Sequence, residues 1–238
     1  MVEAATELIR TTENVIDAIS GRRITGTFAI GSVRTSAIGL LPRAISRLIS
    51  NHSGLKIRLR VGLSETLMQD VASGHLDTAM IAENGVSSPD VVWTPFIREP
   101  LCLVAPLGTP PAPLQQMLAT HPYVRFKANV PLAKVIDREL SRMNPVLNEI
   151  AEMDNVAAVI ACVANGLGIS IVPQVATQNV SPQLVTIPFG DTPVYRQIGL
   201  LRRHTSPRHQ LIDELHEHLA AVSGEYGVGL DTTGRSKA

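Results

Sequence analysis

Short apolar runs that alternate with helix-periodic segments are the feature that most constrains the fold of this chain of 238 residues. The clearest run is residues 55–61. There the apolar residues at 55, 57, 59 and 61 alternate with Lys56, Arg58 and Arg60, as in a strand with one buried face. Strands are expected at 24–31, 55–61, 77–82, 100–106, 122–126, 147–152, 168–173, 184–188 and 194–203, and helices at 3–20, 38–50, 64–73, 131–142, 154–165 and 207–222. Strands that alternate with helices predict an α/β fold with a mostly parallel sheet.

The composition argues against several classes of function. The 21 basic and 21 acidic residues cancel, which gives no general electrostatic reason to bind nucleic acid. Aromatic residues make up only 3% of the chain, too few for base-stacking platforms. Cys102 and Cys162 both lie inside apolar runs, which predicts buried, reduced thiols and neither a disulfide framework nor a redox switch.

The expected location is the cytoplasm. No segment has the roughly 20 uninterrupted apolar residues of a membrane span. Charged residues interrupt the first 20 positions, so no signal peptide is recognisable there. A periplasmic protein whose signal peptide has been removed remains an alternative.

The sequence motifs of common enzymes are not found. Gly166-Leu167-Gly168 lacks a third glycine and follows a helix rather than a strand, which excludes a dinucleotide-binding loop. Ser32 and Ser36 have no identifiable base, and no Cys or His pair has zinc-ligand spacing. We therefore expect no catalytic residues, no metal site, no cofactor and no enzyme activity.

Five short motifs follow one another in a fixed order. They are Gly26-Thr27-Phe28-Ala29-Ile30-Gly31, Leu40-Leu41-Pro42, Gly62-Leu63-Ser64, Gly74-His75-Leu76-Asp77 and Gly166-Leu167-Gly168-Ile169-Ser170-Ile171-Val172-Pro173. Each is weak alone, but their order and spacing over residues 3–222 resemble LysR-type transcriptional regulators. That family often has Tyr-Pro before the second strand, where this chain has His52-Ser53-Gly54-Leu55, a turn without the proline.

The resemblance implies an effector-binding domain of two Rossmann-like lobes, of the type 2 periplasmic-binding-protein kind, joined by two crossover strands. Lobe I would hold residues 21–99 and 204–222, and lobe II residues 100–203. Residues 1–20 would be the end of a linker helix and 223–238 a flexible C-terminal tail. The family's N-terminal winged helix-turn-helix is not found, so we expect a truncated chain or, as the less favoured alternative, a natural stand-alone sensor. DNA would be bound only through that missing domain.

In lobe I, the candidate effector-binding residues lie where strands are followed by helices. The first group is Ser32, Val33, Arg34, Thr35 and Ser36, which offers hydroxyls, backbone N–H groups and a guanidinium ahead of a helix. Its alternative is a capped turn with Arg34 in solvent. Ser64 and Thr66 form the second group, whose alternative is ordinary helix capping with Ser64 at the N-cap.

In lobe II, the candidates are Phe126 and Lys127, then Asn155, then Gly168 and Ile169. Phe126 would wall the cleft and Lys127 would balance an anion, with a surface loop as the alternative. Asn155 has helix capping as its alternative, and Gly168 with Ile169 a packing turn. Arg34 and Lys127 together suggest a small organic anion, held between the lobes as they close.

The first lobe also carries a strong charge asymmetry. Residues 21–60 contain eight basic and no acidic residues, whereas residues 61–99 contain six acidic residues and one arginine. A basic edge could steer anions or pair with a partner subunit, but the favoured interpretation is two faces that neutralise each other within one lobe. The resemblance implies a homodimer or homotetramer through residues 38–61 and 154–165. Val156, Val159, Ile160 and Val163 would suit either that interface or an internal sheet.

Two rival functions share this fold. A solute-binding protein of a transporter has the same two lobes and cleft, but the linker-like helix at 3–20 and the lack of a signal peptide argue against it. An enzyme on the same fold would need a catalytic group that the sequence does not offer. The ligand-sensing domain of a transcription regulator without membrane contacts is therefore the favoured function.

Overall fold

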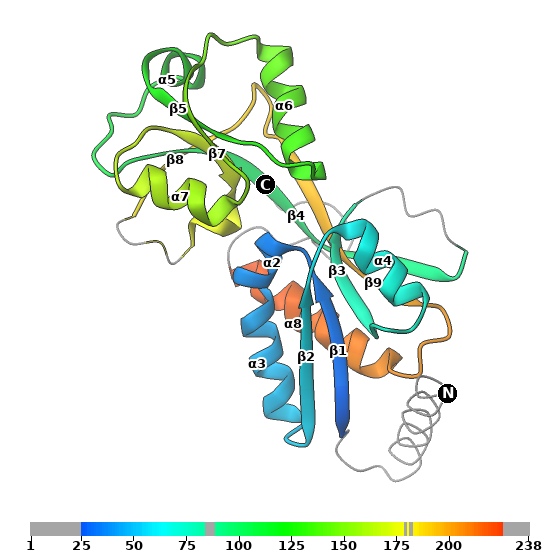
Figure 1. Ribbon diagram of the computed structural model, residues 1–238. Helices are drawn as coiled ribbons and strands as arrows, with labels where there is room; N and C mark the ends of the chain where they lie inside the picture. Colours follow the sequence, from blue (N-terminus) through cyan, green and yellow to red (C-terminus); the bar gives the residue numbers. More distant parts are fainter. Residues whose placement is uncertain (1–24, 84–88, 179, 181–182, 226–238) are drawn as a thin grey trace. The chain divides into compact units, whose positions relative to one another are not determined.

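A computed structural model describes residues 25–83, 89–178, 180 and 183–225 (Figure 1). These residues form two compact units, one of residues 25–97 and 198–225 and the other of residues 98–197. The chain therefore passes between the units twice, within the strands β4 (Val91–Ala105) and β9 (Tyr195–Arg203). The helix expected at 3–20 and the tail after residue 225 lie outside the described residues.

The first unit is built on strands β2 (Leu55–Val61), β1 (Gly26–Ser32), β3 (Thr78–Ala82) and β9, in that order across the sheet. β1 is parallel to both β2 and β3, whereas β9 is antiparallel to β3. The register sets Ser32, the last residue of β1, opposite Val61 on one side and Met80 on the other. The carboxyl ends of three parallel strands therefore meet at one edge of this sheet.

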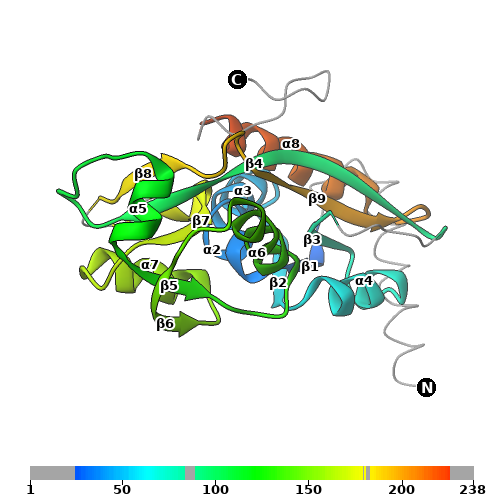
Figure 2. The same cartoon turned by 90° about the horizontal axis from the view of Figure 1, so that it is seen from above.

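Helices cover both faces of this sheet. α4 (Ser64–Ala72) packs on β3 and β1, and its Leu67 and Val71 are fully buried. α3 (Leu41–Asn51) and α8 (His209–Glu225) pack against each other, and Figure 2 shows α8 and α4 on opposite sides of the sheet. A further short helix, α2 (Arg34–Ile38), separates β1 from α3.

The second unit contains a parallel pair of strands, β5 (Pro122–Phe126) and β6 (Asn148–Met153), and an antiparallel group in which β7 (Ser170–Pro173) and β8 (Val185–Pro188) flank β4. Its helices are α5 (Leu114–Thr120), α6 (Pro131–Met143), α7 (Val156–Ala164) and the 3-10 turn η1 (Gln174–Thr177). The core takes residues from β4, β5, β7 and the three α-helices.

The apolar face of α7 belongs to this core. Val156, Val159, Ile160 and Val163 are all at most 7% exposed and pack with the strands of the second unit. Of the two environments that suit these side chains, the structure therefore selects the internal sheet. The residues that α7 leaves exposed are Ala157 and Ala161.

The expected α/β class is confirmed, and the bounds predicted for β2 and β5 are those observed. The predicted helix 38–50 is wrong in its first part: α2 and α3 are separate helices, and Pro42 stands in the first turn of α3, where it has no helical N–H to lose. The strand expected at 100–106 is longer than predicted and starts at Val91. The sequence did not indicate its first half, because Pro95 and Pro100 weaken the strand signal, although they do not prevent the strand from forming. α5 and η1 were not expected.

A buried ion pair lies where the two long strands enter the second unit. Glu99 is 3% exposed and accepts a hydrogen bond from Nε of Arg196, whose side chain is 9% exposed. One residue earlier on each strand, the guanidinium carbon of Arg98 lies 4.1 Å from the centroid of the Tyr195 ring. Charged groups thus tie β4 and β9 together at two successive positions.

Candidate effector site

The predicted loop at residues 32–36 lies at the carboxyl edge of the first unit's sheet. The backbone N–H of Gly62 donates to the carbonyl of Ser32 at 3.1 Å, and that of Val33 donates to the carbonyl of Met80 at 3.0 Å. Ser32 is fully buried, and its hydroxyl donates to the carbonyl of Val33 at 3.0 Å. Open α/β sheets bind ligands at this edge, so the placement suits the predicted role. Gly62 and Met80, which were not among the predicted effector-binding residues, border the same edge.

Two candidate serines lie at helix starts at this edge: Ser64 is the first residue of α4, and Ser36 lies in the first turn of α2. Leu63 occupies the N-cap of α4, so the expectation that Ser64 caps this helix is wrong. Neither α2 nor α4 has a side-chain cap, and no described residue bonds to the hydroxyl of Ser36 or Ser64, although these two residues are only 4% and 6% exposed. Thr66 is exposed in the first turn of α4. The first N–H groups of a helix without a cap remain available to an acceptor.

Arg34 was expected in a loop ahead of a helix, but it is the first residue of α2. Its side chain is exposed, and the described part of the chain gives it no ion-pair partner. Thr35, beside it, is half-buried. An exposed guanidinium next to two uncapped helix starts is an arrangement that favours a carboxylate or another anion.

The candidates of the second unit have packing or pairing roles of their own. Phe126 is 5% exposed and lies in the core, so its ring belongs to the unit's interior. Ile169 is fully buried, and its N–H donates to the carbonyl of Pro122 at 2.8 Å. A Cβ on Gly168 would lie 2.3 Å from that carbonyl oxygen, so a packing turn accounts for this glycine.

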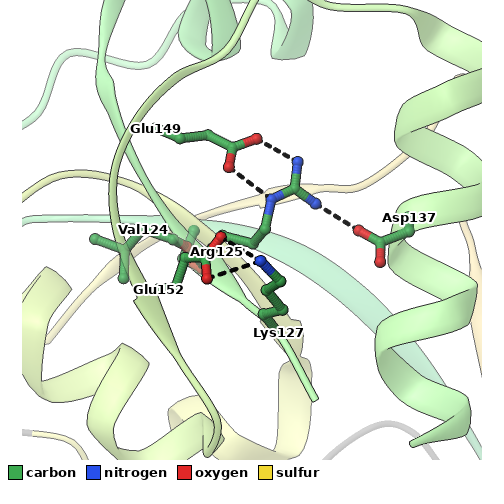
Figure 3. A network of polar contacts seen from close by, with 7 residues as sticks. Val124, Arg125, Lys127, Asp137, Glu149 and Glu152 are labelled. Carbon is green, nitrogen blue, oxygen red and sulfur yellow. Dashed lines mark hydrogen bonds and ion pairs between the residues drawn. The ribbon is translucent and has the colours of Figure 1, made fainter. Parts of the chain in front are cut away.

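Lys127 and Asn155 likewise have partners within the second unit. Nζ of Lys127 contacts both carboxylate oxygens of Glu152, at 2.7 and 2.9 Å, as Figure 3 shows. The lysine charge is thus already balanced by a neighbour. Oδ1 of Asn155 accepts from the N–H of Ala158 at 2.8 Å, so the predicted alternative of helix capping is confirmed for this residue.

The thiols do not form a reactive centre. Burial, together with a smaller contribution from the nearby Glu99 charge, raises the pKa of Cys102 to about 12, so this thiol stays protonated at neutral pH. Cys162 is partly buried on α7 and is also a free thiol. No described group of three His, Cys, Asp or Glu side chains is placed to hold a metal ion.

The raised pKa of Cys102 predicts its reactivity. Because a group with a pKa of about 12 is ionised in only about one molecule in ten thousand at pH 8, we expect iodoacetamide to modify Cys102 at least about 100-fold more slowly than a free cysteine. Mass spectrometry of peptides after timed labelling measures the rate, with the denatured chain as the control. Labelling of Cys102 at equal rates in native and denatured protein would contradict its burial.

Among the described residues, no helix has the length and apolar character needed to cross a membrane.

Among curated proteins, the chain is 30% identical over 148 residues to the Escherichia coli K12 protein described as "Uncharacterized HTH-type transcriptional regulator YeiE", a match that covers 60% of this chain and 50% of that protein. It is 27% identical over 209 residues to a "Probable hydrogen peroxide-inducible genes activator" of Mycobacterium avium, which covers 82% and 64%. The chain spans about half the length of the first of these relatives.

Solved structures share the fold. The Corynebacterium glutamicum OxyR C206S mutant with bound H2O2 matches with a TM-score of 0.72 and 21% identity, over 94% of this chain and 73% of that one. The effector-binding domain of a BenM variant matches with a TM-score of 0.67 and 22% identity, over 85% and 96%. The type 2 periplasmic-binding-protein-like fold of such domains is the fold predicted from the sequence.

A family model described as "LysR substrate binding domain" matches residues 21–224. The match begins before β1 and ends within α8, so it includes all the helices and strands of both units up to the last turn of α8. It also includes the carboxyl edge of β1 and β2 described above. The chain therefore belongs to the LysR substrate-binding domain family.

Proposed function

We propose that this chain senses a small organic anion for a transcription regulator, and that the anion binds at the carboxyl edge of β1 and β2. One observation carries the proposal: exposed Arg34 begins α2, and the hydroxyls of Ser36 and Ser64, residues only 4% and 6% exposed, have no partner among the described residues at helix starts that lack side-chain caps. A carboxylate would accept two hydrogen bonds from the guanidinium and further ones from hydroxyls or backbone N–H groups.

The second unit has a smaller part in this proposal. Phe126, Gly168 and Ile169 are occupied by packing, and Lys127 is paired with Glu152. Contact of the effector with these residues and with Asn155 stays a prediction, as does its position between two lobes. The structure favours Arg34 over Lys127 as the main cation, because Arg34 has no ion-pair partner within the described residues.

We expect Arg34→Ala to weaken binding of the best carboxylate about 10- to 100-fold, since one charge-assisted bidentate contact contributes about 1.5–3 kcal/mol. Isothermal calorimetry of the chain against a panel of small mono- and dicarboxylates measures the affinity. Lys127→Ala is the matched control, expected to change affinity less than about threefold because its charge is paired. Equal affinity in wild type and Arg34→Ala would remove Arg34 from the site.

Sensing requires that the effector bind two states of the protein unequally. The relatives with this domain are described as transcriptional regulators, which supports a sensor and not a transporter component or an enzyme. In the whole regulator, effector binding would change the geometry of the oligomer and so the contacts of a separate DNA-binding domain in the cytoplasm. That consequence belongs to the proposal.

The proposal includes self-association through residues 38–61 and 154–165. Four large apolar side chains of the first segment are exposed, namely Ile38, Ile49, Leu59 and Val61, at 64%, 38%, 43% and 49%. Within the described residues, β2, which carries the last two, forms the end of its sheet and has an unpaired edge. From the second segment, α7 would contribute its small exposed residues, Ala157 and Ala161, since its valines are internal.

A further inference from the structure

A groove in the second unit has no part in the effector site proposed above. It has a volume of about 390 Å³ and lies between α6, β5, β6 and the turn before β6. Leu140 and Leu147 contribute apolar walls, and Arg125, Asp137 and Glu149 contribute charges. All of its lining residues belong to the second unit, so this unit forms the groove alone.

The basic group of the groove is already engaged by its neighbours. Of the described residues that line the groove, only Arg125 is basic, and each of its three guanidino nitrogens donates a hydrogen bond. Nε donates to Glu149 at 2.8 Å, Nη2 donates to the other carboxylate oxygen of Glu149, and Nη1 donates to Asp137 at 2.6 Å (Figure 3). These hydrogen bonds hold the pKa of Glu149 below its usual range, so this carboxylate is charged at neutral pH. Two carboxylates against one guanidinium give the lining a net negative charge.

The hydrogen-bond acceptors of the groove, by contrast, are only partly used. Asp137 accepts through Oδ1, and within the described part of the chain its Oδ2 receives no hydrogen bond. The hydroxyl of Ser141 and the side-chain amide of Asn144 also have no partner among the described residues. The side chains of Asp137 and Glu149 are 49% and 36% exposed, so a donor can reach them from solvent. A ligand that donates hydrogen bonds therefore fits this groove better than one that accepts them.

A buried tyrosine hydroxyl is an independent indication of a ligand. Tyr123 is 1% exposed and lies two residues before Arg125, on the same face of β5, with its ring centroid 5.9 Å from the guanidinium carbon. Burial raises the pKa of Tyr123, the charge of Arg125 opposes this rise, and the charges of Asp137 and Glu149 add to it. The neutral phenol therefore faces the charged groups of the groove. Its hydroxyl has no hydrogen-bond partner in the described ranges, although buried polar groups nearly always have one.

We propose that this groove binds a small organic amine in its ammonium form. The ammonium would donate to Oδ2 of Asp137, with the Tyr123 hydroxyl as a further acceptor. The apolar part of the amine would lie on Leu140 and Leu147 and remove water from them. The ligand has the opposite charge to the proposed effector, so the inference goes beyond the proposed function and does not depend on it.

Three ligands with the same alkyl chain test which charge the groove selects. They are pentylammonium, pentan-1-ol and pentanoate, each titrated into the isotope-labelled chain, and the readout is the amide chemical shifts of Asp137, Ser141, Asn144 and Glu149. We expect pentylammonium to bind at least about 10-fold more tightly than pentan-1-ol, because a hydrogen bond between charged groups contributes more than one between neutral groups. Pentanoate should cause no saturable shift at these four residues, because the net negative charge repels it.

Conservative variants then locate the ammonium. Asp137→Asn removes the charge but keeps the size, and we expect it to weaken pentylammonium binding at least about 10-fold. Tyr123→Phe removes only the hydroxyl and should weaken it about 3- to 10-fold. Glu152→Gln is the matched control: this carboxylate of β6 pairs with Lys127 and is not part of the lining, so the affinity should change less than about twofold. Circular dichroism verifies that each variant is folded.

Four results would overturn the inference. The first is the absence of saturable shifts at the groove with pentylammonium, and the second is equal affinity for pentylammonium and pentan-1-ol. The third is unchanged binding in Asp137→Asn. The fourth is a loss in Glu152→Gln as large as that in Asp137→Asn, which would show only a general attraction of cations to an acidic surface.

Discussion

Replacing Glu99 with glutamine is expected to destabilise the second unit by about 3–5 kcal/mol, because it removes the carboxylate that balances the buried guanidinium of Arg196. Both partners are removed from water, with 3% of Glu99 and 9% of the Arg196 side chain exposed. The pair attracts strongly only because its surroundings are apolar, and the same surroundings penalise the charge that remains. Glutamine preserves the size of the side chain, so the loss reports the charge.

Urea unfolding followed by circular dichroism measures this effect. The fluorescence of Trp93, the only tryptophan of the chain, reports separately on the first unit. Glu152→Gln is the matched control: the same chemical change in an exposed pair, with Lys127 64% and Glu152 51% exposed, is expected to cost less than about 1 kcal/mol. A double variant, Glu99→Met with Arg196→Met, should recover most of the loss. Equal losses for Glu99→Gln and Glu152→Gln would show that burial does not set the strength of the pair.

The fold was predictable where local patterns and burial agree. β2 alternates apolar and charged residues at an edge of its sheet, and β5 is a short apolar run, so both strands were located with their observed bounds. The first half of β4 was missed, because Pro95 and Pro100 reduce strand propensity although the sheet tolerates them. The mostly parallel sheet holds only for β1 with its neighbours and for β5 with β6, since pairing partners far apart in the chain determine strand direction.

The site was less predictable than the fold. The position of Ser32 at a strand end and of Ser64 near a helix start followed from the sequence, because element order and strand polarity determine which edge they occupy. The partner of Lys127 did not, since Glu152 lies 25 residues away and is brought close only by the parallel pairing of β5 and β6. A charged residue near a strand end is thus a ligand candidate only until its neighbours in the sheet are known.

Gly168 was predicted as a ligand contact or as a packing turn, and the fold decides between these roles. Its substitution has the second largest expected effect. We expect Gly168→Ala to destabilise the second unit by about 2–3 kcal/mol, because a Cβ there would lie 2.3 Å from the Pro122 carbonyl oxygen and 2.9 Å from its carbon. The same oxygen accepts the N–H of Ile169, so the backbone cannot move away without loosening the bridge between Tyr123 and Ile169.

Gly166→Ala is the matched control within the same turn. Its Cβ would meet nothing within 4 Å, but its φ of +83° disfavours a side chain, so a loss of about 1 kcal/mol is expected from backbone strain alone. Urea unfolding of the two variants gives the difference, and a Gly168→Ala protein as stable as Gly166→Ala would contradict the close contact. Calorimetry on the folded Gly168→Ala variant, at a temperature well below its unfolding transition, then decides the role of the glycine. Unchanged effector affinity assigns it to packing, whereas a loss of more than about 10-fold would return it to the binding site.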